Sequence, residues 1–457
     1  MKKENFLHRD GMRSARLTLD RRDFLRLGAA GGGLLAGGGW LASSPVQAAL
    51  PKIVSKARIV IAGAGAAGLG LASRLRERLD QATIILIDPR KAHYYQPGFT
   101  LVASGVKPAD YVVSQTMDYV PKNVRLIEEA VAEFDPDGNS VTTASGEKIP
   151  YDFLLVTTGL KLDYTAIEGM EENLIGREGI GSIYHSPEGA AKTWQLMNAF
   201  ADKGGTGVFF RPGGDIKCAG APLKYTFLTR DHLYRRGNLG KARLIYNAHG
   251  KSLFSVPIVH EKVRMLFQER NIETHYNRII KAIDPGKKTL TFESAEEGLV
   301  EIGYDFVNIV PPMRAVDAVR QSPLPWQEGP LAAGGWMEVS KQNLRHARYP
   351  NVFAVGDIAG VPKGKTAASV KWQVPVVVDH LLAQIQGKES GLVYNGYTSC
   401  PLITRLGRAM LVEFDYQNNL TPSFPGVIAP LEELWTTWII KTMGLKPTYL
   451  SMLRGKA

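Results

Sequence analysis

One short stretch near the start of the chain constrains the fold more than any other. Residues 58–62 (RIVIA) predict a strand, and the G-x-G-x-x-G loop Gly63-Ala64-Gly65-Ala66-Ala67-Gly68 follows directly. A predicted helix comes next, and a second apolar strand at 83–87 ends at Asp88. Such glycines let a backbone approach a pyrophosphate at a helix N-terminus, and the acidic residue stands where a ribose hydroxyl needs an acceptor. The stretch predicts a dinucleotide-binding domain built on a parallel sheet.

Two distant segments indicate that the dinucleotide is FAD. Residues 153–156 (FLLV) predict a strand that ends in the small-residue turn Thr157-Thr158-Gly159. Residues 351–355 predict another strand, which ends in Gly356-Asp357. Both segments look like the accessory motifs of flavoproteins with two dinucleotide-binding folds, in which such an aspartate binds the ribitol or pyrophosphate region of FAD. FAD is therefore favoured over NAD.

Residues 166–315 alternate predicted helices and strands, which indicates a second α/β unit with its own parallel sheet. The loop after its strand at 208–210 is where a second dinucleotide-binding fold would place its phosphate-binding glycines. That loop contains Gly213-Gly214 and Cys218, but no G-x-G-x-x-G spacing. A nicotinamide reductant is therefore disfavoured, and thiol chemistry is the alternative use of this position.

The chain contains only two cysteines, Cys218 and Cys400, too few for a disulfide scaffold or a cysteine-rich zinc site. Neither belongs to a C-x-x-C or C-x4-C pair. The residues alone leave two interpretations open: a structural disulfide, as in many exported proteins, or a redox pair. The second has a physical basis, because a cysteine at a loop entering a helix, close to Lys217 and Lys224, would have a lowered pKa.

The first 49 residues have the features of a twin-arginine signal peptide. The sequence DRRDFLR at 20–26 precedes an apolar, glycine-rich run at 27–41, and Ala48 and Ala49 provide a cleavage site. A transmembrane anchor is the alternative, but the run is short and broken by glycines. We expect export of the folded protein to a bacterial periplasm, where it is peripheral on the outer face of the cytoplasmic membrane.

The formal net charge is +11, and the basic residues form no run interleaved with aromatic residues. We therefore expect no nucleic-acid partner, whereas anionic small substrates or an anionic membrane surface suit a basic protein. The nine histidines show no metal-ligand spacing, and we predict no metal site.

The C-terminal end indicates contact with a membrane. Leu434, Trp435, Trp438 and Ile439 fall on one face of a predicted helix, and cationic residues follow them. Paired tryptophans, short length and flanking cations suit an amphipathic helix that lies in the membrane interface. Ordinary core or dimer packing is the alternative that the residues leave open.

Taken together, these segments resemble the sulfide:quinone oxidoreductases, and in particular the branch that includes the mitochondrial enzyme. The resemblance covers about residues 56–456 and rests on specific motifs. They are Tyr94-Tyr95-Gln96-Pro97, Gly179-Ile180-Gly181-Ser182, Lys217-Cys218-Ala219-Gly220-Ala221-Pro222, Pro311-Pro312-Met313, Lys365-Thr366-Ala367-Ala368 and Gly396-Tyr397-Thr398-Ser399-Cys400-Pro401-Leu402.

The resemblance implies a mechanism. Hydrosulfide would attack a Cys218–Cys400 redox disulfide, Cys400 would keep the sulfur as a persulfide, and Cys218 would be the thiolate toward the flavin. Two electrons would pass through FAD to a membrane quinone. Sulfane sulfur would leave to an acceptor such as a thiol, sulfite, cyanide or polysulfide. Lys365 would stabilise negative charge on the reduced flavin.

The resemblance also implies a set of site residues. The predicted FAD contacts are Gly63, Gly65, Ala66, Ala67, Gly68, Asp88, Gln96, Val131, Thr157, Thr158, Gly159, Gly356, Asp357 and Lys365. The predicted membrane and quinone contacts are Leu434, Trp435, Trp438 and Ile439. The chain departs from the family at Lys371-Trp372, where small residues are usual, at Asp88 in place of glutamate, and in having no third cysteine in the first domain.

The expected architecture is an α/β fold with two Rossmann-like domains and a C-terminal amphipathic, membrane-associated segment. The FAD-binding domain takes residues 56–165 and 316–385, the second domain takes 166–315, and the segment with Cys400 takes 386–457. Other functions stay open: a flavocytochrome-type sulfide dehydrogenase that donates to cytochrome c, a type II NADH:quinone oxidoreductase, or a non-catalytic flavin-bearing redox sensor.

Overall fold

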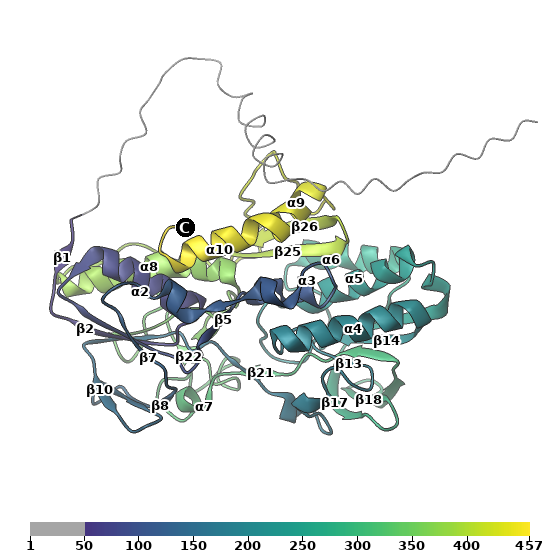
Figure 1. Ribbon diagram of the computed structural model, residues 1–457, viewed down its shortest axis with the longest axis horizontal. Helices are drawn as coiled ribbons and strands as arrows, with labels where there is room; N and C mark the ends of the chain where they lie inside the picture. Colours follow the sequence, from purple (N-terminus) through teal and green to yellow (C-terminus); the bar gives the residue numbers. More distant parts are fainter. Residues whose placement is uncertain (1–50) are drawn as a thin grey trace, which may run out of the picture. The chain divides into compact units, whose positions relative to one another are not determined.

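The first of two parallel sheets carries the glycine loop (Figure 1). The computed structural model describes residues 51–457, so the predicted signal peptide at 1–49 lies outside the described residues. The strand order is β23-β11-β2-β4-β7, and all neighbouring strands are parallel. The strands are β2 (Arg58–Ala62), β4 (Thr83–Ile87), β7 (Arg125–Ile127), β11 (Phe153–Val156) and β23 (Val352–Ala354).

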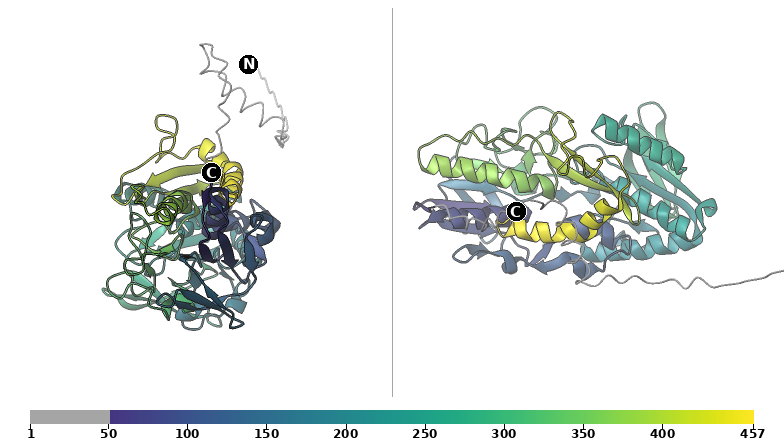
Figure 2. Two further views of the ribbon diagram at one scale, coloured as in Figure 1. Left: turned by 90° about the vertical axis from the view of Figure 1, so that its left-hand side faces the viewer. Right: turned by 90° about the horizontal axis from the view of Figure 1, so that it is seen from above.

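One helix lies on this sheet, and two more pack against that helix. Helix α2 (Ala66–Arg78) leaves the glycine loop and packs against α8 (Ala367–Ile385) and α10 (Leu445–Leu453). The views in Figure 2 show the yellow C-terminal helix α10 beside the purple helix α2. Because helices cover the sheet, the strand residues after Arg58 in β2 are all buried, and the strand is an unbroken apolar run.

The second parallel sheet has the order β13-β20-β14-β15-β16. With this second sheet, the predicted fold class is confirmed: α/β with two Rossmann-like sheets. Helix α4 begins at Pro187, where the preceding Ser186 hydroxyl caps the helix by accepting a hydrogen bond from the Gly189 N–H, 2.9 Å away. The elements are β13 (Ile180–Gly181), α4 (Pro187–Lys203), β14 (Gly205–Phe210), α5 (Ala221–Arg235), β15 (Ala242–Asn247), α6 (Pro257–Glu269), β16 (Glu273–His275) and β20 (Phe306–Asn308).

Smaller antiparallel sheets and short pairs flank the two parallel sheets. The three-stranded ones are β8 (Val131–Asp135), β9 (Ser140–Thr143) and β10 (Lys148–Pro150), and β17 (Arg278–Asp284), β18 (Thr289–Ser294) and β19 (Gly298–Gly303). The paired strands are β1 (Ile53–Val54) with β3 (Leu79–Asp80), β5 (Ala92–Tyr94) with β6 (Val113–Gln115), β12 (Lys161–Leu162) with β21 (Met313–Arg314), and β22 (Met337–Glu338) with β24 (Ala359–Gly360). Two short helices are α3 (Phe99–Val102) and α7 (Asp317–Arg320).

The C-terminal part brings Cys400 to the second sheet. Strands β25 (Thr398–Arg405) and β26 (Arg408–Phe414) form a hairpin, and β25 packs against α5, the helix that follows Cys218. Two cysteines that are 182 positions apart in sequence are therefore carried by elements in contact.

The C-terminal helix differs from the expected one in where it begins. Helix α9 covers Trp435–Ile439, a π-helical turn covers Ile440–Gly444, and α10 follows. Leu434, expected on the helix face, lies just before the helix because its backbone pairs with Ala409 of β26 through two hydrogen bonds of 3.0 and 3.1 Å. Trp435 is half exposed, and Trp438 is partly buried against a small apolar cluster. Among residues 51–457, no helix is both long and apolar enough to cross a bilayer.

Candidate active site

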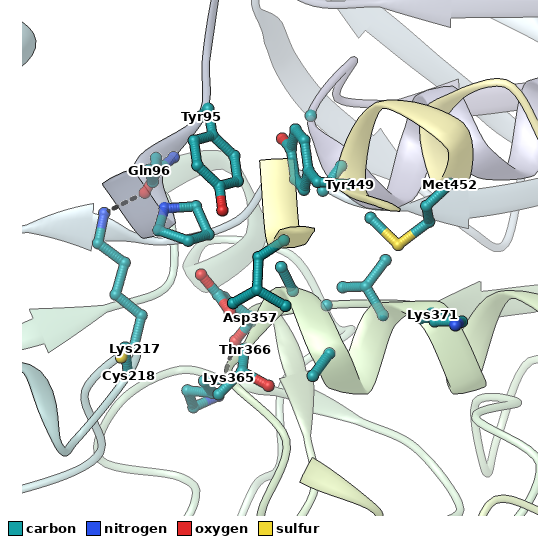
Figure 3. Close-up of a pocket in the computed structure, with 18 of the residues that line it drawn as sticks. Tyr95, Gln96, Lys217, Cys218, Asp357, Lys365, Thr366, Lys371, Tyr449 and Met452 are labelled. Carbon is teal, nitrogen blue, oxygen red and sulfur yellow. Dashed lines mark hydrogen bonds between the residues drawn. The ribbon is translucent and has the colours of Figure 1, made fainter. Parts of the chain in front are cut away.

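A cavity of about 670 Å³ runs between the glycine loop, the Cys218 loop and the C-terminal elements (Figure 3). It is where the carboxyl ends of the first sheet's strands open, as expected for a ligand site in a doubly wound sheet. Ten of the fourteen predicted FAD contacts line it: Gly65, Ala66, Ala67, Gln96, Thr157, Thr158, Gly159, Gly356, Asp357 and Lys365.

The three glycines of the loop have different physical roles. A Cβ on Gly68 would lie 1.8 Å from the carbonyl oxygen of Gly63, and one on Gly63 would lie 2.4 Å from the carbonyl oxygen of Thr157. These two glycines do not line the cavity; they allow close packing within the loop and between the loop and the Thr157 backbone. Gly65 has no protein atom within 4 Å of its would-be Cβ and faces the cavity, so its lack of a side chain leaves room for a ligand.

Asp88 and Val131 do not line the cavity, although both are predicted contacts. The Asp88 carboxylate is buried and accepts hydrogen bonds from the Ala64 N–H at 2.8 Å and from Arg90 at 3.0 Å. Burial alone raises the pKa of Asp88, but hydrogen bonds and charge from Arg90 outweigh it and leave the pKa lowered. Asp88 therefore holds the glycine loop in place through the Ala64 N–H, without lining the cavity. Val131 begins β8, which belongs to a separate antiparallel sheet, and this placement removes it from the cavity wall.

The polar groups that line the cavity fit FAD. Glycine-loop amides at the N-terminus of α2 border it and suit a pyrophosphate. The Thr158 hydroxyl and the Tyr95 phenol both line it and are buried, with no hydrogen-bond partner among the described residues. Burial raises the pKa of Asp357, while the charges of Lys217 and Lys365 oppose that rise. Polar groups therefore converge on a space that only a ligand would satisfy.

Lys365 is buried, and its ammonium group contacts the protein backbone and an aromatic ring. Its Nζ atom donates to the carbonyl oxygens of Asp357 at 2.7 Å and Ala359 at 3.3 Å and lies 3.6 Å from the Trp336 ring centroid. Burial lowers its pKa to about 8. Its own carbonyl oxygen accepts a 2.9 Å hydrogen bond from the Cys218 N–H. Lys365 therefore ties the Asp357 loop to the Cys218 loop.

Cys218 has a left-handed backbone with φ of +45°, which is uncommon for a residue with a side chain. Hydrogen bonds hold it there: its carbonyl oxygen accepts from the Ala221 N–H at 2.8 Å and from the Tyr184 hydroxyl at 3.0 Å. Such a conformation costs about 1–3 kcal/mol and persists only when neighbours fix it. The Cys218 side chain is thereby directed at the cavity, which it lines.

The two cysteines are neighbouring free thiols in the structure. Cys400 is buried, and a Cβ on Gly220 would lie 2.5 Å from its Sγ atom, so glycine at that position makes room for it. The hydrogen bond between the thiols is the largest cause that lowers the pKa of Cys218 well below its usual value, and it raises the pKa of Cys400. The pair therefore holds one proton on Cys400 and leaves Cys218 as the thiolate.

A lysine pair supports this thiolate. Lys224 is buried on the first turn of α5 and donates from Nζ to the Cys218 Sγ atom at 3.4 Å. Lys441, on the π-helical turn, is also buried and donates to the Pro97 carbonyl oxygen at 2.7 Å. Both charges lower the Cys218 pKa. Burial lowers the pKa of Lys441 itself to about 7.

The sequence pointed to Lys224 but missed Lys441, which reads as the polar side of a membrane helix. Lys217, expected beside the thiol, extends the other way and donates from Nζ to the Gln96 Oε1 atom at 2.6 Å (Figure 3). Burial lowers the pKa of Lys217 to about 8. Among residues 51–457, no cluster of potential metal ligands occurs.

Comparison with known proteins agrees with this geometry. Residues 57–186 match the family model described as pyridine nucleotide-disulphide oxidoreductase. The mitochondrial sulfide:quinone oxidoreductase of Mus musculus is 33% identical over 87% of this chain and 86% of its own. The mitochondrial sulfide:quinone oxidoreductase of Dictyostelium discoideum is 34% identical over 82% of this chain and 81% of its own.

A solved structure shares the fold. The sulfide:quinone oxidoreductase of Aquifex aeolicus aligns with a TM-score of 0.73 at 23% identity, covering 88% of this chain and 92% of that one. Two Rossmann-like sheets around a dinucleotide cavity that is bordered by thiols define a flavoprotein of the disulphide oxidoreductase class with FAD as its cofactor. Within that class, the chain belongs to the sulfide:quinone oxidoreductase family.

Proposed function

We propose that this protein oxidises hydrosulfide at Cys218 and Cys400 and passes two electrons through FAD to a membrane quinone. The observation that carries the proposal is the contact between Lys224 and Cys218, beside Cys400 and on the wall of the cavity that fits FAD. Family membership supports the same activity.

The thiol steps balance with three reactants: hydrosulfide, a nucleophilic acceptor for the sulfur, and FAD as the acceptor of two electrons. Hydrosulfide attacks Cys400 in a Cys218–Cys400 disulfide, so one S–S bond forms as another breaks, and Cys218 leaves as a thiolate. Lys224 and Lys441 stabilise the negative charge on that leaving group. A nucleophilic acceptor then takes the outer sulfur from the Cys400 persulfide. The Cys400 thiolate re-forms the disulfide with Cys218, which releases two electrons.

FAD, when bound, supplies a two-electron acceptor for these thiols. We propose that Gly65, Ala66 and Ala67 border its pyrophosphate, while Thr158 and Asp357 supply polar contacts. Gly63, Gly68 and Asp88 shape the loop from behind. The protein fixes the Cys218 backbone so that its sulfur faces the same cavity, and this placement is its own contribution to electron transfer.

We also propose a periplasmic location and a peripheral attachment to the membrane. The twin-arginine pattern supports export. The exposed apolar side chains that follow β26 support attachment: Phe424, Val427, Trp435 and Met443. A lipid-soluble quinone requires access from the bilayer, and Trp438 and Ile439 belong to the same short helix. We propose that the outer sulfur passes to a thiol, sulfite, cyanide or polysulfide.

An anaerobic absorbance titration tests the proposal. Stoichiometric sulfide should bleach the flavin of the purified holoenzyme, and a short-chain quinone should restore its absorbance, whereas cytochrome c or NADH should not react. C218S and C400S should still bind FAD and be bleached by dithionite, but they should lose bleaching by sulfide. Rapid bleaching of either variant by sulfide, or oxidation only by cytochrome c, would contradict the proposed function.

A further inference from the structure

A buried carboxylate lines the cavity, and the thiol steps do not use it. Glu413, on β26, is 3% exposed and borders the same cavity as Gln96 and Asp357. It forms no ion pair with any of the residues 51–457. Burying a carboxylate without a cation is costly, and such groups are retained mainly at functional positions.

Hydrogen-bond donors alone hold the Glu413 side chain. The Tyr397 phenol and the Ser423 hydroxyl both donate to Oε1, the latter at 2.6 Å, and the Ser423 N–H donates to Oε2 at 2.8 Å. The hydroxyl oxygens of Tyr397 and Ser423 are themselves 3.2 Å apart. The three side chains thus form one continuous hydrogen-bonded chain.

This chain of hydroxyl and carboxyl groups connects water to the cavity. Ser423 is exposed, Tyr397 is partly buried and Glu413 is buried, yet all three line the cavity. Burial and the neighbouring carboxylate raise the pKa of Tyr397, which keeps its phenol protonated and able to donate at neutral pH. A proton can therefore pass from solvent at Ser423 to the buried end without crossing apolar surface.

The surroundings suit a quinone ring. Tyr397 lies with its ring centroid 5.3 Å from that of Trp372, at 56°. Phe424 borders the same part of the cavity and is 46% exposed. It begins the loop that carries Val427, which is 81% exposed. An apolar ring that enters from the bilayer side would meet these aromatic groups next to Tyr397 and Glu413.

We propose that Glu413 and Tyr397 deliver the protons that quinone reduction requires, and that Ser423 returns protons from solvent. This inference rests on the proposed function. Reduction of a quinone to a quinol consumes two electrons, supplied through FAD, and two protons. The Tyr397 hydroxyl gives its proton to a quinone oxygen, and Glu413 takes a proton from water by way of Ser423 and passes it to the Tyr397 oxygen. Each turnover uses the route twice.

The test separates proton delivery from electron delivery. Holoenzyme is reduced with dithionite, so that the thiol steps are bypassed, and is then mixed in a stopped-flow instrument with a short-chain quinone or with ferricyanide. Ferricyanide takes electrons without protons. We expect E413Q to slow reoxidation by the quinone about a hundredfold, the range of general acid catalysis. Reoxidation by ferricyanide should stay within about twofold of wild type, since it needs no proton.

Two further variants keep the outcome decisive. Y397F retains the ring beside Trp372 and removes the hydroxyl, so it should also slow only the quinone reaction and change its solvent deuterium isotope effect. E432Q makes the same chemical change at an exposed glutamate of the C-terminal part and should alter neither reaction. Equal losses with quinone and ferricyanide, or a normal quinone rate in both E413Q and Y397F, would show that the relay is wrong. Failure of sulfide to bleach the flavin would instead contradict the proposed function alone.

Discussion

The Nζ atom of Lys224, on the first turn of α5, lies 3.4 Å from the Sγ atom of Cys218, in the loop before that helix. The lysine is buried, so water screens its charge little. A cation fixed at this distance stabilises a thiolate in preference to a thiol. The Cys400 thiol and then the Lys224 charge lower the pKa of Cys218 well below its usual value, whereas the pKa of Cys400 is raised.

We predict that K224M raises the pKa of the Cys218 thiol by about one to three units, the range for loss of a close opposite charge. The thiolate fraction at neutral pH then falls, and alkylation by iodoacetamide slows. Thiolate absorbance and alkylation rate of the reduced enzyme, measured across pH, give the shift. K217M is the matched control, because Lys217 contacts Gln96 and its loss should move the thiol pKa much less. Equal shifts in the two variants would contradict this assignment.

We predict that the glycines of the dinucleotide loop separate into two classes. G68A should destabilise the protein and lose FAD together, because the added Cβ would lie 1.8 Å from a backbone oxygen. G65A should leave the thermal stability of the cofactor-free protein unchanged and weaken FAD binding, because only a ligand can meet that Cβ. Thermal denaturation of the stripped protein and the flavin-to-protein absorbance ratio measure the two effects. An unstable cofactor-free G65A protein would refute the distinction.

We predict that the ion pair between Arg270 and Glu433 anchors the C-terminal part. Arg270 is 8% exposed and Glu433 17%, and the two carboxylate oxygens lie 2.6 and 2.7 Å from Arg270 Nη2. R270M leaves a partly buried carboxylate unpaired and should cost up to about 3–5 kcal/mol in the free energy of unfolding, the range for a fully buried pair. Urea denaturation measures this. Loss of the exposed, 4.0 Å pair Lys262–Glu432 serves as the control and should cost far less.

The contribution of that ion pair should also depend on pH. Burial raises the pKa of Glu433, but hydrogen bonds and charge from Arg270 outweigh it, so the pKa in the folded state is lowered. A group with a lowered folded-state pKa stabilises the protein above its unfolded pKa and loses that effect as pH falls through the folded value. The stability difference between wild type and E433Q should therefore shrink in acid. A difference that stays constant below that range would exclude the ionic contribution.

We predict that V427D and W435D release the protein from anionic lipid vesicles. Each substitution removes an apolar side chain whose burial in the membrane interface contributes about 1.5–3 kcal/mol of binding free energy, so affinity should fall roughly tenfold or more. Sedimentation with vesicles measures this, and sulfide oxidation with ferricyanide as acceptor should remain normal. L299D, at a 71% exposed leucine of β19 in the second domain, is the control and should bind vesicles as wild type does. Equal losses in all three variants would indicate charge repulsion instead of a defined membrane face.

The fold and much of the site could be predicted because each of their motifs is a short, continuous stretch of sequence. The glycine loop, the turn Thr157-Thr158-Gly159 and the Gly356-Asp357 turn each follow a strand, and parallel strands bring their ends to one edge. Lys441 escaped prediction because a π-helical turn and long-range packing, neither visible in local sequence, direct it at the thiols. Lys217 misled because its side chain extends to Gln96, whereas Lys224, six residues after Cys218, contacts the sulfur.

The position of Lys441 links the C-terminal helix to the thiol pair. It sits in the same short C-terminal stretch as Trp435, which is half exposed and suited to lipid, yet its buried charge acts on Cys218. Any shift of that stretch on the bilayer moves a positive charge relative to the sulfur. Under the proposed attachment, thiol ionisation and lipid binding would therefore be coupled in both directions. The pKa of the Cys218 thiol would then differ between the free protein and the protein bound to vesicles.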